Sequence, residues 1–573
     1  MIEIFVFSFL SSIHLYICGY LFYYFFISKE ISIKHNIFEL ALYGAFGLCF
    51  LALFLNFFTS LNKTINNVLL FFPIIIFLIF YFNKHFLKKA FKYSLPIAIL
   101  FLITISYDNS YRPDAGLYHL PYISILNENK ILIGINNIHY RFGHTSIMQY
   151  LSAIYNNNIF NEVGVTIPLC LIFCNFVGYL IFEIFNKKNP KPVIIFAFII
   201  LTFILFRVNR YSSFGNDAPA NLLFFYLIIE SLKKNENFLK IKKTLFASLF
   251  VFLNKITLLL GFLIPIYFFF KNFKFNFLFN KMNIFCVFFI ILYLTKNVLI
   301  SGCLVFPVEQ SCFKNIYWYD KDSKRGSNAI NTRLENEAWT KGWVNQIGER
   351  KDYKTYISDF NWLKTWKNSE AKRIIKKMIP FTIFSILLFM ILFFYEYKNR
   401  NKHKFLDPIN LNIDYYVNLL ICFLGSLLWL LKFPVFRYGY GYLISFASIL
   451  IILIIKDYKF FVDIFKFKKK IKYIIIILLS GVLIKNSNRI YPNLYKNIDP
   501  WPGIYSANKI NKKKENTPII KNQKIIFYKA KKGECYYSKS PCTHFYNGSD
   551  FKLNEINLDN FQGYKIYYFN NKK

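Results

Sequence analysis

The sequence predicts an α-helical polytopic membrane protein of about 12–14 transmembrane helices, with interfacial helices in its first large outer loop and a small α+β or β appendage at its C-terminal end. Of the 573 residues, 55% are hydrophobic and only 18% are charged, whereas soluble domains carry about 25% charged residues. Apolar runs such as 4–27 and 38–60 reach the roughly 20 residues that a helix needs to cross a bilayer. This composition excludes collagen-like, coiled-coil and disordered chains.

The strong positive charge has a membrane explanation. The formal net charge of +39 comes from 70 Lys and Arg against 31 Asp and Glu. A nucleic-acid-binding surface would concentrate these cations on one folded face. Here they lie in short segments between apolar runs, as in the cytoplasmic loops of membrane proteins. We therefore expect contact with membrane lipid and no nucleic-acid partner.

Hydropathy and helix breakers define the expected spans. The first apolar run is longer than the roughly 7–15 residues of a signal-peptide core and follows no basic segment, so we expect it to be a retained span. Residues 244–270 are expected to cross twice, as a short helical hairpin around Asn254 and Lys255. The spans lie near residues 4–27, 38–60, 67–82, 93–106, 163–185, 193–206, 218–232, 244–270, 283–298, 378–396, 415–431, 439–455 and 473–485.

Lysine clusters indicate which ends of the spans are cytoplasmic. These clusters lie at 84–92, 187–191, 233–243, 271–281, 398–404 and 466–470. The opposite side then receives the loops 107–162 and 299–377 and the tail. We expect a multi-pass protein of the bacterial inner membrane whose active face is periplasmic, with a transmembrane domain at 1–485 and a small periplasmic domain at 486–573.

Cysteine positions test this assignment. Of ten cysteines, six lie in apolar runs, where a small hydrophobic side chain is the simplest interpretation. Cys303 and Cys312 form one close pair, and Cys535 and Cys542 form another, both in segments assigned to the periplasm. Because oxidising compartments preserve disulfides, each pair is expected to form a short-loop bridge. A zinc site is the alternative, although no Cys-x-x-Cys or His-x-x-His spacing accompanies the pairs.

The tail has the pattern of short strands. Residues 524–528 and 564–569 are rich in β-branched and aromatic residues and lie among Gly, Asn and Lys. A domain of fewer than about 90 residues has a marginal core, which a disulfide would help to stabilise.

The densest group of ionisable residues lies in the outer loop between residues 107 and 146. Apolar residues recur at helical spacing after Asp114 and again after Ser146, so two short interfacial helices are expected. Asp114 begins the first of them, where an aspartate either accepts from backbone amides of the first turn or serves a function. The candidate site residues in this loop are Asp108, Asp114, Tyr118, His119, His139 and Arg141.

Charged residues elsewhere are expected on the same side. Asp217 precedes a span, Lys255 lies in the expected hairpin turn, and Lys296 and Arg437 lie close to span ends, where a cation either snorkels to the surface or serves a function. Two carboxylates with several cations suit one chemistry: a carboxylate deprotonates an acceptor hydroxyl, while the cations stabilise a phosphate leaving group. Loop 299–377 adds five of the seven tryptophans, which suit either sugar rings or an interfacial belt: Trp318, Trp339, Trp343, Trp362 and Trp366.

Three blocks carry a resemblance to a known family. They are residues 114–121, which begin with Asp-Ala-Gly-Leu-Tyr-His, residues 134–143, and residues 301–307, which run from Ser-Gly-Cys to Pro. With these blocks the chain resembles the C-type glycosyltransferase (GT-C) superfamily, and especially its poorly characterised bacterial branch. The resemblance implies many transmembrane helices with juxtamembrane helices in the first large outer loop. It also implies an inverting transfer of a sugar from a polyprenyl-phosphate-linked donor.

The resemblance assigns the family's outer-loop acidic residue to Asp114. We expect Asp114 to act as base or acceptor-orienting group, with Asp217 as a second acid. The expected substrate-binding residues are Asp108, Tyr118, His119, His139, Arg141, Lys255, Lys296 and Arg437. The acceptor would be a surface glycan, a lipid or a protein. We expect either no cofactor or a divalent cation, Mg²⁺ or Mn²⁺, whose ligands the sequence leaves unknown.

Two other functions fit parts of the sequence. A polymerase or ligase of surface polysaccharide also carries a large periplasmic loop with Arg and His, but needs no outer-loop aspartate. A lipid or glycan transporter ranks third. Transporters tend to show internal repeats and charged groups at the middle of the membrane, whereas this sequence shows no convincing repeat and most of its polar groups gather at one surface.

Overall fold

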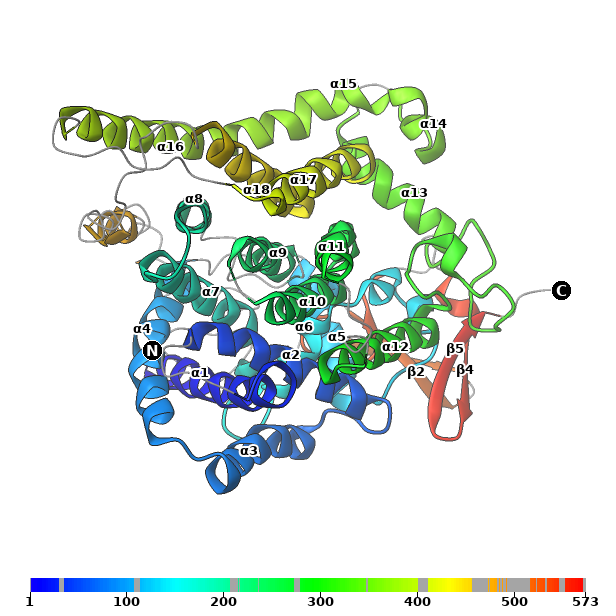
Figure 1. Cartoon of the computed structure of the whole chain (residues 1–573). Coiled ribbons are helices and arrows are strands. Elements are labelled where there is room, and N and C mark those ends of the chain that lie inside the picture. The colour runs from blue at the N-terminus through cyan, green and yellow to red at the C-terminus, as the bar shows by residue number, and fades with distance from the viewer. Residues whose placement is uncertain are drawn as a thin grey trace.

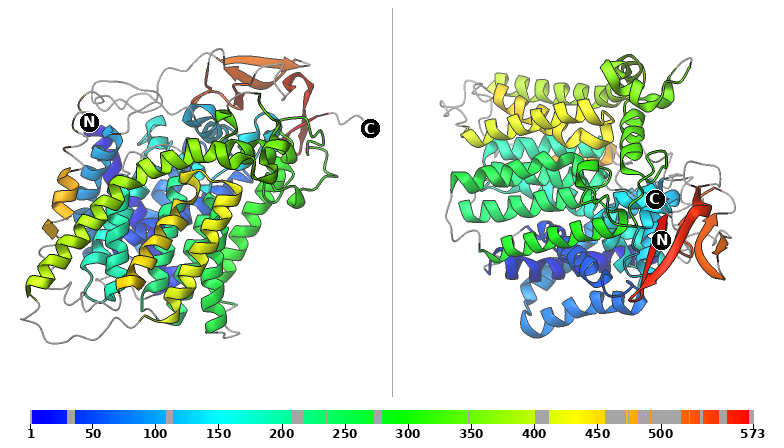
Figure 2. Two further views of the ribbon diagram at one scale, coloured as in Figure 1. Left: turned by 90° about the horizontal axis from the view of Figure 1, so that it is seen from above. Right: turned by 90° about the vertical axis from the view of Figure 1, so that its right-hand side faces the viewer.

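The structure is a computed structural model that describes residues 2–29, 36–107, 114–206, 215, 217–234, 236–272, 279–346, 349–399, 411–455, part of 472–491, 516–521, 523–530, 533–545 and 552–569. Most of these residues are helical. The long helices run roughly parallel, and a small group of strands lies at one end of the bundle, beside the segments around residues 115–160 (Figures 1 and 2). The expected span at 473–485 lies in part outside the described residues.

The first half of the chain supplies eleven of the numbered helices. They are α1 (Ile2–Phe22), α2 (Ile37–Asn56), α3 (Lys63–Phe80), α4 (Lys84–Tyr107), α5 (Leu120–Glu128), α6 (Ile147–Ile154), α7 (Ile167–Phe185), α8 (Lys191–Phe206), α9 (Asp217–Leu232), α10 (Asn237–Asn254) and α11 (Leu263–Lys271). Two short segments matter for the site: the π-helical turn η2 (Ala115–His119) before α5 and the 3₁₀ segment η7 (Ile256–Phe262) before α11.

The second half continues with helices and ends in strands. The helices are α12 (Lys281–Ser301), α13 (Ala329–Thr340), α14 (Tyr353–Ile357), α15 (Trp362–Trp366), α16 (Lys372–Asn399), α17 (Ile413–Lys432) and α18 (Phe436–Ile455). The strands are β1 (Asn516–Lys521), β2 (Lys524–Ala530), β3 (Cys542–Thr543), β4 (Ile556–Phe561) and β5 (Tyr564–Phe569).

Seven helices of the described residues are long and apolar enough to cross a membrane. They are Ile2–Ile27, Ile37–Asn56, Lys63–Phe80, Glu162–Phe185, Lys281–Ser301, Ile413–Lys432 and Phe436–Ile454. Two apolar helices, Lys191–Phe206 and Ile256–Lys271, are shorter. The predicted membrane-type helical fold is thus present, although fewer helices than the expected 12–14 meet the length and composition of a full span.

Local sequence explains how several of these helices begin and pack. The side chains of Asn36, Asn62 and Asn280 accept an amide hydrogen bond in the first turns of α2, α3 and α12. Helices α1 and α2 approach closely because glycines face the neighbouring backbone. A β-carbon at Gly19 would lie 1.8 Å from the Leu40 carbonyl oxygen. Such contacts between apolar helices need residues without a side chain.

The structure contains the expected hairpin around Lys255. Helix α10 ends at Asn254, and Lys255 has extended backbone angles of φ −157° and ψ 115°. The chain then returns through η7, and Ser248 Oγ donates to the Gly261 carbonyl oxygen at 3.1 Å. Helix α11 packs against α10. Lys255 therefore lies at the turn of two antiparallel segments, at one end of α10.

The two short helices expected in the outer loop are also present, but their polar side is covered. Ser124 and Asn127 on α5 are only 1% and 7% exposed. Ser124 Oγ donates to the Ser538 carbonyl oxygen, and Tyr537 Oη donates to Asn127 Oδ1 at 2.9 Å. Purely interfacial helices would present these residues to water. The segment 533–545 covers them instead.

Residues 516–569, the C-terminal unit, contain the predicted strands. Strand β2 pairs antiparallel with β1 and parallel with β3, while β4 and β5 form an antiparallel hairpin. The hairpin docks on the outer loop, because Ile133 N–H donates to the Lys565 carbonyl oxygen at 3.0 Å and Tyr567 N–H donates to the Ile133 carbonyl oxygen at 2.9 Å. The C-terminal unit is therefore attached to the loop that carries Asp114.

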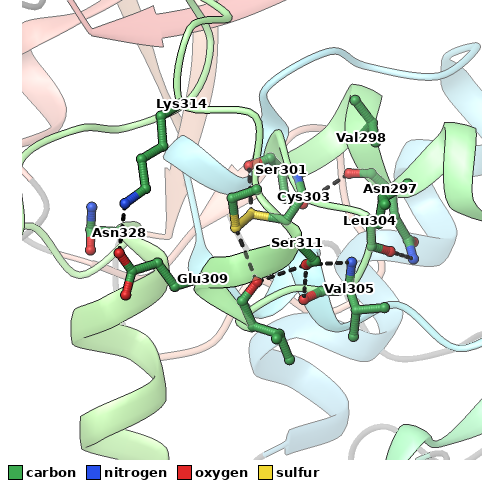
Figure 3. Close-up of a disulfide and its surroundings, with 12 residues drawn as sticks. Asn297, Val298, Ser301, Cys303, Leu304, Val305, Glu309, Ser311, Lys314 and Asn328 are labelled. Carbon is green, nitrogen blue, oxygen red and sulfur yellow. Dashed lines mark hydrogen bonds and ion pairs between the residues drawn. A yellow bond between two sulfur atoms is a disulfide. The ribbon is translucent and has the colours of Figure 1, made fainter.

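Both predicted disulfides are formed. Cys535 bonds to Cys542 within the C-terminal unit, and Cys303 bonds to Cys312 just after α12. Figure 3 shows how hydrogen bonds reinforce the loop closed by the Cys303–Cys312 disulfide: Asn297 Nδ2 donates to the Leu304 carbonyl oxygen at 2.8 Å, and Val305 N–H donates to Ser311 Oγ at 3.0 Å. The remaining six cysteines are buried with free thiols: Cys18, Cys49, Cys170, Cys174, Cys286 and Cys422.

A buried network of charges was not predicted. Lys233 Nζ lies 3.0 Å from Glu183 and 2.5 Å from Glu230, and Lys243 Nζ lies 2.6 Å from Glu39 and 3.4 Å from Glu230. All five residues are at most 7% exposed. Asp217 begins α9 and Glu230 lies near its other end, so at 1.5 Å per residue the network lies roughly 20 Å from Asp217. Part of the expected 233–243 lysine cluster is therefore paired inside the bundle.

Removing one carboxylate from this network should destabilise the fold strongly. We expect Glu230→Ala to lower the free energy of unfolding by about 3–5 kcal/mol, because two buried ammonium groups lose a partner. Thermal unfolding of the purified protein in detergent measures the effect, and Glu349→Ala at an exposed position is the control. A melting temperature equal to that of the control would contradict a stabilising network.

Candidate functional site

Four charged side chains from distant parts of the chain meet at one end of the bundle. Arg437 lies between the two predicted carboxylates: its Nη1 is 3.5 Å from Asp114 Oδ2, and its Nε is 3.4 Å from Asp217 Oδ2. Lys255 Nζ forms an ion pair with Asp217 Oδ1. The side chains of Asp114 and Arg437 are 41% and 36% exposed, whereas that of Lys255 is only 11% exposed. We call these four residues the charged cluster.

Each member of the charged cluster lies where a helix begins or ends. Asp114 directly precedes η2, Asp217 begins α9, Lys255 follows α10, and Arg437 lies in the first turn of α18. Carboxylates near helix N-termini are favoured by the positive end of the helix dipole. The sequence predicts Asp114, Asp217 and Arg437 on one side of the membrane, and the fold brings these helix ends, which are far apart in the chain, into contact.

Hydrogen bonds between side chains and backbone groups hold the helix ends in register. Asn221 Nδ2 donates to the Asp217 carbonyl oxygen at 2.7 Å and to the Arg437 carbonyl oxygen at 3.1 Å, and its Oδ1 accepts from Gly441 N–H at 2.7 Å. Thr257 Oγ1 donates to the Tyr438 carbonyl oxygen at 3.2 Å. Asn221 therefore fixes α9 to α18. It was not predicted, because the sequence does not reveal the hydrogen-bond partners of an asparagine inside an apolar helix.

Asp114 is not a helix-capping residue. Its backbone is helical, and its side chain accepts no capping hydrogen bond. Burial alone would raise the pKa of its carboxyl group, but the nearby Arg437, His119 and Arg141 outweigh that effect, so the pKa lies below its ordinary value. Asp114 is therefore ionised at neutral pH, and its carboxylate is held by cations from other elements.

Aromatic rings surround the cations of the site. The Arg141 guanidinium lies 5.1 Å from the ring centres of both Tyr118 and Tyr140, and its Nε donates to Tyr140 Oη at 3.1 Å. Lys255 Nζ lies 3.5 Å from the ring centre of Tyr438. These cation–π contacts keep the charged groups in place without neutralising them. Tyr140 and Tyr438 were not predicted as site residues.

Of the five loop tryptophans, Trp339 lies at the charged cluster. Its ring centre is 5.6 Å from the Arg437 guanidinium carbon, and it is 40% exposed. The other indoles serve packing. Trp318 Nε1 donates to the Val298 carbonyl oxygen, Trp343 Nε1 to that of Lys351, and Trp366 Nε1 to that of Pro434, while Trp362 is buried.

His119 lies just behind the charged cluster. Gln149 Oε1 accepts from Ser146 N–H, so its amide Nε2 donates to His119 Nδ1 at 3.3 Å and leaves the ring proton on Nε2. Burial lowers the pKa of His119 from 6.5 to about 4. The ring is therefore neutral at physiological pH and becomes charged only in the acid range in which Asp114 titrates.

The buried neutral His119 predicts a loss of stability in acid. Its folded pKa is lower than its unfolded pKa, so protons bind preferentially to the unfolded chain between pH 6.5 and about 4. Stability should fall as the pH falls through this window, by on the order of 3 kcal/mol for this residue. We expect His119→Gln to lose less stability than the wild type between pH 6.5 and 4, measured by thermal unfolding in detergent. An unchanged pH dependence would contradict a buried neutral ring.

Other predicted site residues are not members of the charged cluster. Lys296 is fully buried, donates to Thr145 Oγ1 at 2.5 Å and lies 4.1 Å from the Tyr293 ring centre, so it supports the loop and forms no ion pair with the charged cluster. His139 accepts from Arg141 N–H through Nδ1 at 3.1 Å and lies on the Arg141 side of the site. Asp108 lies outside the described residues.

The described residues do not offer a metal site at this position. Within them, no three His, Cys, Asp or Glu side chains gather so that they could hold a metal ion. The two carboxylates of the charged cluster are instead paired with Arg437 and Lys255. This donor set does not fit a divalent cation, and we derive no step through one.

The comparison with known proteins gives a family but no activity. No curated protein and no solved structure matches the chain. Residues 1–444 match a family model described as a domain of unknown function (DUF8201). This match contains all four members of the charged cluster and ends before the C-terminal unit. Because it covers more than half of the sequence, the chain belongs to the DUF8201 family.

Proposed function

We propose that this protein is an integral membrane glycosyltransferase that moves a sugar from a polyprenyl-phosphate-linked donor to a glycan, lipid or protein acceptor. The observation that carries the proposal is the position of Arg437 between Asp114 and Asp217. It places a carboxylate suited to general-base catalysis beside cations suited to a leaving phosphate. The resemblance of residues 114–121 to C-type glycosyltransferases supports the same reaction.

The charge balance of the site favours an anionic substrate. The Lys255–Asp217 pair has no net charge, which leaves the guanidinium groups of Arg437 and Arg141 against the single carboxylate of Asp114, an excess of one positive charge. Arg141 makes no ion pair with a carboxylate in the described part of the chain. A phosphate group bound at the site would offset this excess and gain charge-assisted hydrogen bonds.

The proposed reaction proceeds in one displacement. The Asp114 carboxylate accepts the proton of the acceptor hydroxyl as its oxygen attacks the anomeric carbon. The bond between the anomeric carbon and the donor phosphate oxygen breaks, and the electron pair leaves with the polyprenyl phosphate. Arg437, Lys255 and Arg141 stabilise the negative charge that develops on the phosphate, and the anomeric configuration inverts. Asp217 orients Lys255 and Arg437.

We further propose that the protein is a multi-pass protein of the bacterial inner membrane and that the charged cluster faces the periplasm. Seven apolar helices of membrane-spanning length support the membrane location. Two disulfides, one of them in the unit docked on the Asp114 loop, support an oxidising compartment at this end. The lysine-rich segments would then be cytoplasmic.

Transfer by purified protein tests the proposal. The protein in detergent is incubated with a synthetic polyprenyl-phosphate-linked sugar and a cell-envelope extract as acceptor, and the release of polyprenyl phosphate is followed by mass spectrometry. We expect release that depends on the acceptor, with the sugar recovered on it. In a deletion strain, single lipid-linked sugars should accumulate. Accumulated complete but unpolymerised repeat units would show a polymerase instead.

The buried network at the other end of α9 and α10 favours one second candidate, a lipid or glycan transporter. Ionisable residues inside a helical bundle often mark an ion or substrate pathway. Here three glutamates meet two lysines at Glu230 and its neighbours. Movement of a lipid-linked sugar from one leaflet to the other in vesicles that contain the purified protein, with no covalent product, would establish the transporter and reject the transferase.

A further inference from the structure

The C-terminal unit reaches the Arg141 side of the site with two aromatic residues. The ring of His544 lies 5.1 Å from that of His139, and the ring of Phe545 lies 4.6 Å from it. Tyr140 and Phe545 are stacked at 6.1 Å. These residues follow β3 and the Cys535–Cys542 disulfide, so a covalently closed loop positions them against the outer loop.

Two buried imidazole nitrogens in this contact have no hydrogen-bond partner in the described part of the chain. They are Nε2 of His139 and Nδ1 of His544. His139 is 1% exposed. Because its Nδ1 accepts from Arg141 N–H, its Nε2 carries the ring proton and is a donor without an acceptor. A buried donor without an acceptor is unfavourable, so the site is incomplete without an acceptor.

Arg141 adds a positive charge to the same place. Burial and the proximity of His544 and Arg141 lower the pKa of His139 well below 6.5, and burial with Arg141 lowers that of His544 to about 4. Both rings are thus neutral at physiological pH, and each carries one N–H group. Among the described residues, Arg141 lies beside aromatic rings and forms no ion pair with a carboxylate.

We propose that His139, His544 and Arg141 form an oxyanion subsite that binds a phosphate group, and that the C-terminal unit completes it by supplying His544. Two imidazole N–H donors and a guanidinium match the several acceptor oxygens of one phosphate. The proposal rests on the proposed function in one respect: the phosphate bound there is that of the lipid-linked donor or its product. Asp114, whose pKa Arg141 helps to lower, is then close to the same group.

Calorimetric titration of the purified full-length protein in detergent tests the subsite. The probes are inorganic phosphate and farnesyl phosphate, with farnesol as a control without the anion. We expect both phosphates to bind and His544→Gln to weaken each by roughly tenfold or more, because the terminal amide of glutamine does not reproduce the position of Nδ1 and a hydrogen bond to a charged group is lost. His544→Arg should retain binding, since a guanidinium also donates to phosphate. His85→Gln, at an exposed position in α4, should have no effect.

The outcomes separate the subsite from its alternatives. Binding of farnesyl phosphate alone would assign the subsite to a lipid headgroup, and equal binding of inorganic phosphate would assign it to the anion itself; both support it. Phosphate binding that His544→Gln leaves unchanged, while the variant keeps its disulfide and melting temperature, overturns it. Zn²⁺ binding that both His544→Gln and His544→Arg abolish, without phosphate binding, also overturns it.

The same titration distinguishes failure of the subsite from failure of the proposed function. If the wild type transfers sugar but binds phosphate independently of His139 and His544, the subsite is wrong and the transferase stands. If phosphate binding depends on both histidines but no donor is ever turned over, the transferase is wrong and the subsite stands.

Discussion

Replacing Asp114 by asparagine should abolish sugar transfer. Asparagine keeps the shape of the side chain but cannot accept the acceptor proton, and it removes the negative charge that faces Arg437 at 3.5 Å. Loss of a general base costs about 10²–10⁴ in rate. The measurement is release of polyprenyl phosphate by purified Asp114→Asn protein at saturating donor.

The matched control for this variant is Asp559→Asn, because Asp559 is exposed on β4. Both variants should have wild-type melting temperatures, since Asp114 makes no helix cap. The low pKa of Asp114 adds a second readout: activity should persist as the pH falls to below the usual carboxyl pKa of 3.8, as far as the fold survives. Full activity of Asp114→Asn would contradict its role as base.

Replacing Arg437 should have the second largest effect. Its guanidinium contacts carboxylates from two different elements through Nη1 and Nε. Arg437→Gln should lower kcat by about 10²–10³, the usual cost of losing one group that stabilises developing negative charge. Arg437→Lys should recover only part of this, because an ammonium group cannot bridge two carboxylates with the geometry of a planar fork.

The control for Arg437 is Arg373→Gln, whose side chain is 59% exposed. A merely structural role for Arg437 would lower the melting temperature and leave kcat of the folded fraction unchanged. Equal kcat values for Arg437→Lys and the wild type would contradict the bridging geometry.

Features that depend on local pattern could be predicted from the sequence. The two disulfides follow from close cysteine spacing within segments assigned to one side. The break at Lys255 follows from a polar pair inside an apolar run, and the strands follow from β-branched and aromatic residues near the C-terminal end. The convergence of Asp114, Asp217 and Arg437 was also predicted, because each lies at a span end assigned to the same side.

Features that depend on distant partners could not be predicted. From the sequence alone, the polar side of α5 is expected to face water. Only the fold shows that the segment around Tyr537 covers it. Lys233 and Lys243 belong to a lysine-rich segment typical of cytoplasmic loops, and only the fold shows that glutamates from three other helices pair with them. Lys296 has the sequence context of Arg437, yet it contacts Thr145 instead of the charged cluster.

Cysteine accessibility at positions 114 and 437 reports whether Asp114 and Arg437 share one site that faces the periplasm. Single Asp114→Cys and Arg437→Cys variants are labelled in spheroplasts with a membrane-impermeant maleimide, with and without added polyprenyl phosphate. We expect both positions to react from the periplasmic side and the lipid phosphate to slow labelling at both. Labelling at either position only in inverted vesicles, or protection of one position without the other, would contradict a shared outward-facing site.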